Sequence, residues 1–214
     1  GYHFFSRNIF CLNYRGQRLN HRILRYAYYA SQSLDNTNFS EKEKKITLDL
    51  GGGYGGLSRV LFNQLDNIIP IIIEIPEVCA FAHYFLKNNF PDKKIGTIED
   101  LSSVEKIDGK VISNYDFIVL PQTFIEKIDD NVVDLSINTT SLGEMSNEVQ
   151  DYYIQQIERI TKKYFYSVNR AKVRKDKYDA KGFYNLKLNS RWKSIIYKYS
   201  HTYHIEFLGK KIKR

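Results

Sequence analysis

Five glycines within six residues follow a short apolar segment in the first third of the chain. The segment is Ile46-Thr47-Leu48-Asp49-Leu50, and the glycine-rich stretch is Gly51-Gly52-Gly53-Tyr54-Gly55-Gly56. Apolar residues then recur at helical spacing from Leu57 to Leu65. Because glycine has no Cβ, such a turn lets the backbone bend tightly and lets a ligand approach it closely. The pattern predicts a strand, a turn and a helix, with the turn open to a ligand.

The rest of the chain alternates between strand and helix patterns. The β-branched run at 68–75 is typical of a buried parallel strand, and Pro76 suits the first turn of a helix that runs to about Asn89. Residues 92–114 are polar and predict an excursion before the next strand. The other expected elements are helices at 17–34 and 146–160 and strands at 116–120, 132–137, 164–168, 193–199 and 203–208. This order predicts a three-layer α/β domain that closes on a β-hairpin.

Length and composition set the class of protein. The chain has 214 residues, 43% hydrophobic and 26% charged, so it can bury a full core as one sizeable domain. Its two cysteines, Cys11 and Cys79, exclude a disulfide framework and favour a reducing compartment, so a cytoplasmic protein is expected. No run of about 18 apolar residues occurs, so no membrane span is expected. The expected organisation is an N-terminal helical segment at 1–45, acting as a lid, and a main domain at 46–214.

Charge is distributed unevenly along the chain. Residues 162–214 hold 16 Lys or Arg and 3 Asp or Glu, a balance of +13, whereas the first 161 residues have a balance of −5. A basic section can serve a nucleic acid, an anionic membrane surface or an anionic small substrate. The alternative is a solvated face of Lys and Arg with no partner.

An acidic residue ends the second strand of the pattern. Glu74 stands 19 residues beyond Gly55, and a carboxylate at that place can accept both hydroxyl hydrogens of a ribose. Two kinds of cofactor fit this pattern. The first is a dinucleotide, because Gly51, Gly53 and Gly56 satisfy the dinucleotide-binding pattern G-x-G-x-x-G. The acidic-x-G-x-G-x-G pattern of S-adenosylmethionine (SAM) enzymes is equally satisfied, and Asp49, two residues before the first glycine, favours SAM because it can face the ligand's amino-acid end.

A second polar motif follows the strand expected at 132–137. It reads Asn138-Thr139-Thr140-Ser141-Leu142-Gly143-Glu144-Met145-Ser146. In an open α/β sheet the carboxyl ends of the strands line the ligand crevice, so Asn138, Thr139, Ser141 and Glu144 are expected near the reacting end of the cofactor. The motif lacks N-P-P-Y and has no cysteine nearby, which disfavours amino-methylation of adenine and C5 methylation of pyrimidines. Transfer to oxygen or to a simple nitrogen remains.

These motifs resemble a known family. The glycine-rich stretch, followed by Glu74-Ile75-Pro76-Glu77, is similar to class I SAM-dependent methyltransferases. The run from Asp134 to Met145, with Tyr152-Tyr153 and Tyr166-Ser167-Val168-Asn169, resembles the sugar O-methyltransferases of bacterial surface-polysaccharide clusters. The resemblance covers roughly residues 45 to 170 and implies a Rossmann-like, mostly parallel seven-stranded sheet with an antiparallel last strand.

The resemblance also implies roles for individual residues. By position, Gln122 and Thr123 match the loop that meets the adenine, although many relatives carry an Asp where Gln122 stands. The other expected cofactor contacts are Asp49, Gly51, Gly52, Gly53, Tyr54, Gly55, Glu74, Ile75, Asn138 and Thr139. Ser141 and Tyr152 are expected to contact the acceptor, with helix packing as the alternative for Tyr152.

The expected reaction is methyl transfer from SAM to a hydroxyl of a sugar or glycan precursor. It requires alignment of donor and acceptor and a base to take the hydroxyl proton. Glu144 is the first candidate for that base and His21 the second; the alternative for Glu144 is a structural carboxylate that bonds local backbone N–H groups. No cluster has metal-ligand spacing, so no metal is expected.

Three functions remain open from the sequence. An O-methyltransferase would use the basic section for an anionic acceptor, such as a nucleotide-linked or phosphorylated sugar. An RNA methyltransferase, for which the partner is a nucleic acid, is the less favoured alternative. The third is a methyltransferase-like binding protein with a degenerate site, against which the intact glycine turn and Glu74 argue.

Overall fold

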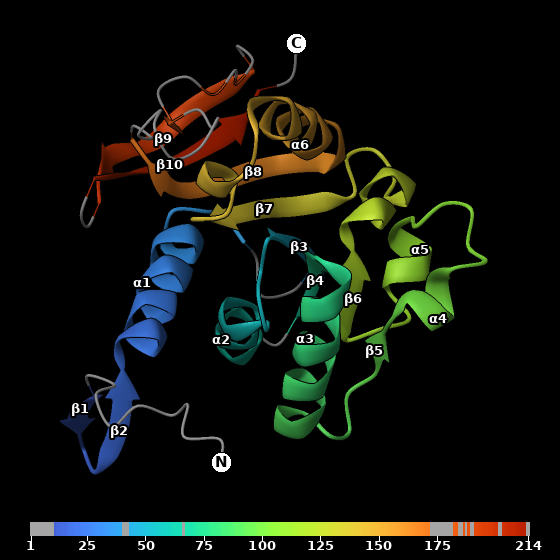
Figure 1. The fold of residues 1–214 in the computed structure, drawn as a ribbon, viewed down its shortest axis with the longest axis horizontal. Coiled ribbons are helices and arrows are strands. Elements are labelled where there is room, and N and C mark those ends of the chain that lie inside the picture. The colour runs from blue at the N-terminus through green and yellow to red at the C-terminus, as the bar shows by residue number, and fades with distance from the viewer. Residues whose placement is uncertain are drawn as a thin grey trace.

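One eight-stranded sheet organises the molecule (Figure 1). The computed structural model describes residues 11–39, 43–65, 67–171, 182–183, 186, 188, 191–200 and 203–212. The strand order is β5-β6-β4-β3-β7-β8-β10-β9, with the first six strands parallel and β10 antiparallel to both of its neighbours. The strands are β3 (Lys45–Leu50), β4 (Ile68–Glu74), β5 (Ile95–Gly96), β6 (Phe117–Pro121), β7 (Val133–Thr139), β8 (Thr161–Arg170), β9 (Trp192–Tyr199) and β10 (His204–Lys211).

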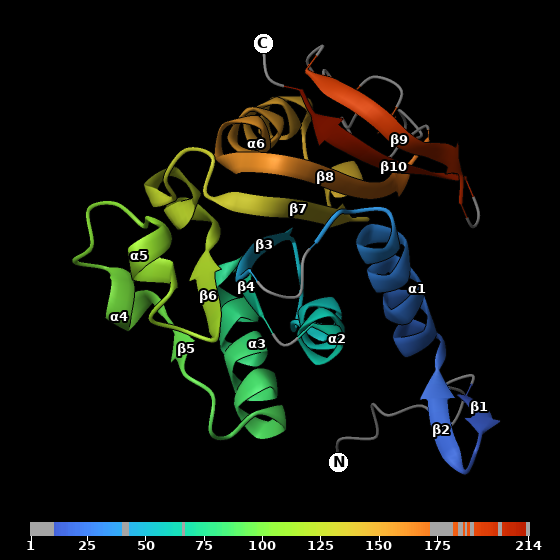
Figure 2. The same cartoon turned by 180° about the vertical axis from the view of Figure 1, so that it is seen from behind.

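Helices cover both faces of this sheet, so the molecule has three layers: helices, sheet and helices. The helices are α1 (His21–Asp35), α2 (Gly56–Gln64), α3 (Pro76–Asn89), α4 (Ile98–Leu101), α5 (Gly109–Ile112) and α6 (Asn147–Ile160), with short 3₁₀ turns η1 (Gln122–Lys127) and η2 (Leu142–Glu144). Buried residues of α1, α2 and α3 pack on one face, and those of α4, α5 and α6 pack on the other. Figures 1 and 2 show α1, α2 and α3 in a row along one side of the molecule. The predicted three-layer α/β class is therefore confirmed.

The central strand β4 shows why a continuous apolar run becomes a strand here. Ile69, Ile71 and Ile73 face the α6 side, while Ile68 and Ile72 face the α1–α3 side, so both faces are buried. A strand covered on both faces has no polar side, which is why its sequence does not alternate. Pro70, which lacks an N–H, pairs only with β3, because pairing with β6 starts one residue later.

The sheet has one more strand than the seven expected. The additional strand is β5, a two-residue segment that pairs with β6 at the edge of the sheet. It lies within residues 92–114, which were predicted to be a polar excursion, together with α4 and α5. A strand this short carries no detectable periodicity, because alternation needs at least four residues to show.

The predicted helix at 17–34 begins four residues late. Residues 17–20 instead form β2 (Gln17–Asn20), which pairs antiparallel with β1 (Cys11–Tyr14). Arg15 and Gly16 have φ of 49° and 77°, the left-handed backbone that a two-residue hairpin turn requires. Asn20 then caps α1, its side chain accepting a hydrogen bond from the Ile23 N–H at 2.9 Å.

None of the described helices combines the length and the apolar character that crossing a membrane requires.

Candidate functional site

The carboxyl ends of the parallel strands define the place where a ligand can bind. From β3 the chain continues to β4 on one side, whereas β7 lies on the other side of β3. This reversal creates a crevice between the ends of β3 and β7, which is where open α/β sheets bind their ligands. The glycine-rich turn follows β3 and the Thr139–Ser141 turn follows β7, so the two sequence motifs meet at this crevice.

A cavity of about 200 Å³ opens at these strand ends. Its lining residues are Leu50, Gly51, Ile73, Glu74, Ile75, Gln122, Met145, Val149 and Tyr153. Four residues that the sequence predicts as cofactor contacts are therefore brought together: Gly51, Glu74, Ile75 and Gln122. A larger cavity of about 470 Å³ lies between α3 and residues 95–100, lined by His83 and Cys79 among others, and contains none of the predicted site residues. We assign the smaller cavity as the site because it lies at the crevice.

Three glycines of the turn, Gly51, Gly53 and Gly55, have left-handed backbone, and the first two have different surroundings. At Gly51, φ is +70° and an added Cβ would lie 2.3 Å from Ser141 Oγ, so a side chain has no room. At Gly53, φ is +56° and an added Cβ would meet nothing within 4 Å. Gly51 is thus needed for close packing inside the protein, whereas Gly53 borders open space that a ligand can fill.

Glu74 connects the glycine turn to the end of β4. Its Oε2 accepts a hydrogen bond from the Gly53 N–H at 2.8 Å, and its Oε1 accepts one from the Ile75 N–H at 2.9 Å. Each carboxylate oxygen retains a lone pair that can accept a further hydrogen bond. Ile75 beside it is 47% exposed, which offers an apolar surface at the rim of the cavity. Together they suit a ligand with hydroxyl groups next to an apolar ring.

Asp49 lies beneath the turn rather than at its surface. The residue is 3% exposed, and the atoms that an added Cβ on Gly52 would meet first belong to its side chain. Ser58 Oγ donates to its Oδ2 at 3.4 Å, while Oδ1 is buried without a hydrogen-bond partner. Burial first, and then the negative charge of Glu74, raise the pKa of Asp49 to about 7. A cationic ligand at the turn would favour the ionised form.

Tyr54, one of the expected cofactor contacts, packs against two other aromatic rings of the protein. Its ring centroid lies 4.8 Å from that of Phe85 on α3 and 6.3 Å from that of Tyr26 on α1, edge-on to both. An added Cβ on Gly56 would meet the rings of Tyr26 and Tyr54 below 3 Å. Burial is also the main reason why the pKa of Tyr26 is raised to about 12. Tyr54 therefore joins α1, the turn and α3.

Asn138 supports the crevice from behind. It is fully buried, and its Nδ2 donates to Leu50 O at 2.9 Å and to Ser141 Oγ at 2.5 Å. Its Oδ1 accepts from Asn169 Nδ2 at 2.8 Å and from the Leu142 N–H at 3.4 Å. With both ends of its amide occupied, Asn138 fixes the ends of β3, β7 and β8 relative to one another, instead of offering the ligand a free group.

Gln122 offers an unused hydrogen-bond acceptor to the cavity. Its Oε1 is buried and has no hydrogen-bond partner, and the residue lines the cavity at the end of β6. A buried amide oxygen without a partner is unfavourable unless a ligand or water donates to it. The position therefore suits a ligand that carries an N–H group.

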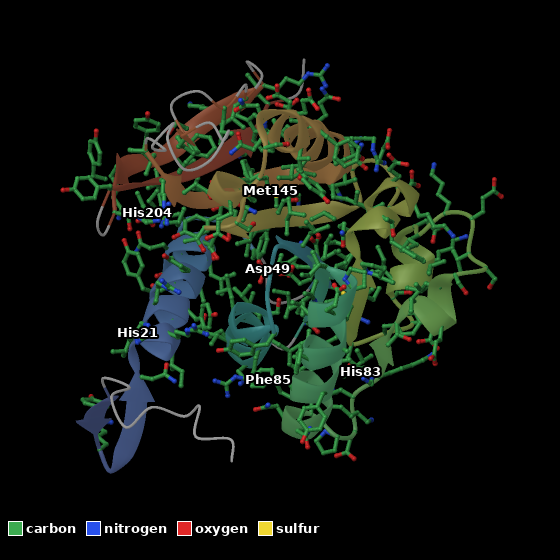
Figure 3. The ribbon with its side chains drawn as sticks, in the orientation of Figure 1. His21, Asp49, His83, Phe85, Met145 and His204 are labelled. Atoms are coloured by element: carbon green, nitrogen blue, oxygen red, sulfur yellow. The ribbon has the colours of Figure 1, made fainter. Side chains whose placement is uncertain are left out.

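The other predicted residues lie at the margins of the site. Thr139 and Ser141 are half-buried at the end of β7, whereas Thr123 is exposed on η1. Glu144 is exposed at the end of η2, and its backbone N–H donates to Ser141 O at 3.0 Å. His21 is exposed at the first residue of α1, and Figure 3 shows it well apart from Asp49.

Tyr152 does not line the cavity and has a hydrogen-bond partner on η1. Its hydroxyl donates to Glu126 Oε1 at 2.9 Å on η1, and its ring packs against Tyr153 with centroids 5.1 Å apart. Burial, followed by the Glu126 hydrogen bond, raises the pKa of Tyr152 to about 12. These contacts agree with the alternative interpretation of Tyr152 as a packing residue.

Sequence reasoning missed the wall of the cavity that α6 and the preceding Met145 provide. Met145, Val149 and Tyr153 line it, and Figure 3 shows Met145 above Asp49 in that view. Val149 and Tyr153 lie four residues apart on one face of α6, and Met145 lies just before the helix, so part of the signal was present in the sequence. Only the position of α6 over the crevice shows that this face meets a ligand site in addition to the core.

No protein-family model and no curated protein matches the chain. Solved structures match its fold. A SAM-dependent methyltransferase from Aquifex aeolicus has a TM-score of 0.57 at 14% identity, covering 89% of this chain and 97% of that one. Magnesium protoporphyrin IX methyltransferase from Synechocystis PCC 6803, with bound SAM, has a TM-score of 0.59 at 11% identity, covering 89% and 80%.

A third match is longer than this chain. The mitomycin 7-O-methyltransferase MmcR has a TM-score of 0.59 at 13% identity, covering 88% of this chain but 54% of its own length. The chain thus spans about half the length of that enzyme. All three structures share with this chain a central parallel sheet, antiparallel final strands and helices on both faces. The chain therefore has the Rossmann-like fold of these methyltransferases.

Proposed function

We propose that the protein is a SAM-dependent O-methyltransferase that acts on a hydroxyl group of a sugar or glycan precursor. The observation that carries the proposal is the open space beside Gly53, bordered by a carboxylate that already accepts the Gly53 N–H. Unlike the similarly open Gly16 in the β1–β2 hairpin, Gly53 lies in the turn that follows β3 and beside the Glu74 carboxylate. The fold shared with methyltransferases of known structure supports the same conclusion.

The residues of the cavity fit each part of SAM. Glu74 has lone pairs left for the ribose hydroxyls, and Ile75 offers an apolar surface for the adenine. The unpaired Oε1 of Gln122 can accept from the adenine amino group. At the other end, the glycine turn receives the amino-acid moiety, and the carboxyl group of Asp49 beneath it opposes the positive charge.

SAM, when bound, supplies a methyl group that its sulfonium charge has already activated. The chain then has two tasks: to align the acceptor hydroxyl and to accept its proton. We propose Glu144 for the second task. It is exposed at the end of η2, directly after the Thr139–Ser141 turn, where an acceptor can reach it. The N-terminal segment with α1 remains the proposed lid.

The choice of a sugar acceptor is supported by the sequence motif from Asp134 to Met145 and by the basic section at 162–214. In that section, Lys198 lies 3.6 Å from the buried Glu206 carboxylate, and Lys211 donates to the backbone oxygens of Glu158 and Thr161. These two lysines serve the protein itself, which weakens the case for a continuous phosphate-binding track. Binding that weakens steeply with salt would instead favour an RNA acceptor.

Calorimetric titration with SAM and with S-adenosylhomocysteine tests the cofactor. We expect saturable binding at one site, and no binding would contradict every enzymatic function proposed here. A mass-shift screen against nucleotide-linked sugars, phosphorylated sugars and glycans then tests the acceptor. The expected gain is one methyl group on an oxygen, and a product methylated only on nitrogen or on RNA would contradict the sugar assignment.

The Glu144→Ala variant is expected to lower kcat at least about tenfold on the acceptor that the screen identifies, because it removes the carboxylate proposed to take the hydroxyl proton. The Kd for SAM should not change, since Glu144 does not line the cavity. Glu148→Ala, which removes an exposed carboxylate four residues later in the first turn of α6, is the control and should retain activity. Turnover that survives Glu144→Ala nearly unchanged would remove Glu144 from the mechanism.

A further inference from the structure

The turn that follows β7 contains a strained residue. Thr140 has a φ of 69°, and of the four non-glycine residues with positive φ in the described part of the chain it is the only β-branched one. A β-branched side chain in the left-handed region collides with its own backbone, so such residues are rare outliers. The conformation persists only where the surrounding structure enforces it, and such strain clusters at functional sites.

Hydrogen bonds on both sides enforce this conformation. The Thr140 N–H donates to Val168 O at 2.8 Å on the neighbouring strand β8. Before it, Asn138 is held by Asn169 Nδ2 and by its own bond to Leu50 O. After it, Ser141 Oγ accepts from Asn138 Nδ2 and donates to Leu50 O at 3.2 Å. The turn is thus tied to β3, β7 and β8 together.

The strained backbone places Ser141 directly against the glycine turn. The space where a Cβ of Gly51 would stand is filled by Ser141 Oγ and Cβ, at 2.3 and 2.5 Å from that position. An ordinary negative φ at Thr140 would redirect the following peptide and withdraw Ser141 from Gly51. The conformation of the glycine turn is therefore coupled to that of Thr140.

We propose that Thr140 is a positioning residue for SAM. Through Ser141, its strained backbone holds the glycine turn in the form that receives the amino-acid end of the cofactor. The ligand then binds a turn that is already in its bound conformation, and loses no affinity to rearranging it. This role rests on the proposed function, because it assumes that SAM occupies the space beside Gly53.

The test compares two variants of Thr140 with a control at the other end of the same strand. Thr140→Gly removes the strain and frees the backbone, so the midpoint of urea unfolding should equal or exceed that of the wild type, while the Kd for SAM rises about tenfold. Thr140→Asn keeps the left-handed conformation, which asparagine tolerates, and should bind SAM within about threefold of the wild type. Asn131→Gly, at an exposed residue with φ of 54° before β7, should leave the Kd for SAM unchanged, and it controls for affinity alone because it also removes the Oδ1 that accepts from Lys211 Nζ at 3.1 Å.

Opposite changes in stability and affinity are the signature of this role. A Thr140→Gly variant that binds SAM as tightly as the wild type overturns the proposal. Parallel losses of stability and affinity also overturn it, because they indicate ordinary structural damage. If Thr140→Asn loses as much affinity as Thr140→Gly, the threonine side chain acts rather than the backbone, and the proposal is wrong. Wild-type protein that binds no SAM contradicts the proposed function itself, which separates the two failures.

Discussion

The Gly53→Asn variant is expected to weaken SAM binding by about 100-fold or more, equivalent to about 2.7 kcal/mol, while the protein remains folded. An added Cβ at this position meets no protein atom within 4 Å, so a side chain projects into the open space that is proposed to hold the cofactor. Asparagine tolerates the left-handed backbone that Gly53 adopts, so the expected loss of folding stability is below about 1 kcal/mol. Calorimetric titration with SAM, together with urea unfolding, measures both quantities.

Gly16→Asn is the matched control for this experiment. Gly16 also has positive φ and open space around its Cβ position, but it lies in the turn between β1 and β2. The same substitution there should leave the Kd for SAM unchanged. Unimpaired binding by Gly53→Asn would mean that the ligand space lies elsewhere, and the cavity between α3 and residues 95–100 would become the first alternative.

The sequence predicts those parts of the fold whose signal is local. The isoleucines of β4 are buried on both faces, and a strand with two buried faces is recognised by its continuous apolar run. The hairpin β1–β2 escaped detection because Leu19 and Ile23 mimic helical spacing, whereas the turn depends on the backbone of Arg15 and Gly16. There the geometry of two turn residues outweighs the hydrophobic pattern.

Some residues of the candidate site could likewise be predicted from the sequence, and others could not. Gly51, Glu74, Ile75 and Gln122 could be predicted, because each ends a strand or follows one directly, and parallel strands end at one edge of the sheet. The role of Asn138 could not, because its four hydrogen bonds join segments up to 88 residues apart in the sequence. From the sequence alone, an asparagine at a strand end suggests a ligand contact. Only the fold shows that both ends of the Asn138 amide already have hydrogen-bond partners.

The neighbours of the Tyr54 ring could not be predicted from the sequence either. A tyrosine inside a glycine turn suggests stacking on a ligand, but its ring meets Phe85 and Tyr26 instead. Which neighbour an aromatic ring finds depends on how α1 and α3 pack around α2, and this is tertiary information. The same packing places α1 against the turn that the cofactor is proposed to occupy, so the N-terminal segment and the site are physically linked.

Asp49 is expected to make the stability of the ligand-free protein depend on pH. Its folded-state pKa of about 7 exceeds the value near 3.8 of an unperturbed Asp, so the native state holds a proton that the unfolded state has lost. The contribution is complete below about pH 4, falls as pH rises, and is lost above about pH 7. Relative to Asp49→Asn, the free energy of unfolding of the wild type should fall by up to about 4 kcal/mol across this range.

Comparing the two proteins removes the other titrating groups, which both share, and urea unfolding at several pH values measures the difference. Parallel curves would contradict this prediction, because they would show that Asp49 ionises in its usual range. The buried Oδ1 of Asp49 would then need a hydrogen-bond donor that the structure does not show. The same group links pH to the proposed cofactor. Because SAM is cationic, its binding favours ionised Asp49, so titrations at pH 6 in buffers of different ionisation enthalpy should reveal proton release. Asp49→Asn should abolish that release, which ties the buried carboxyl to the ligand above it rather than to folding alone.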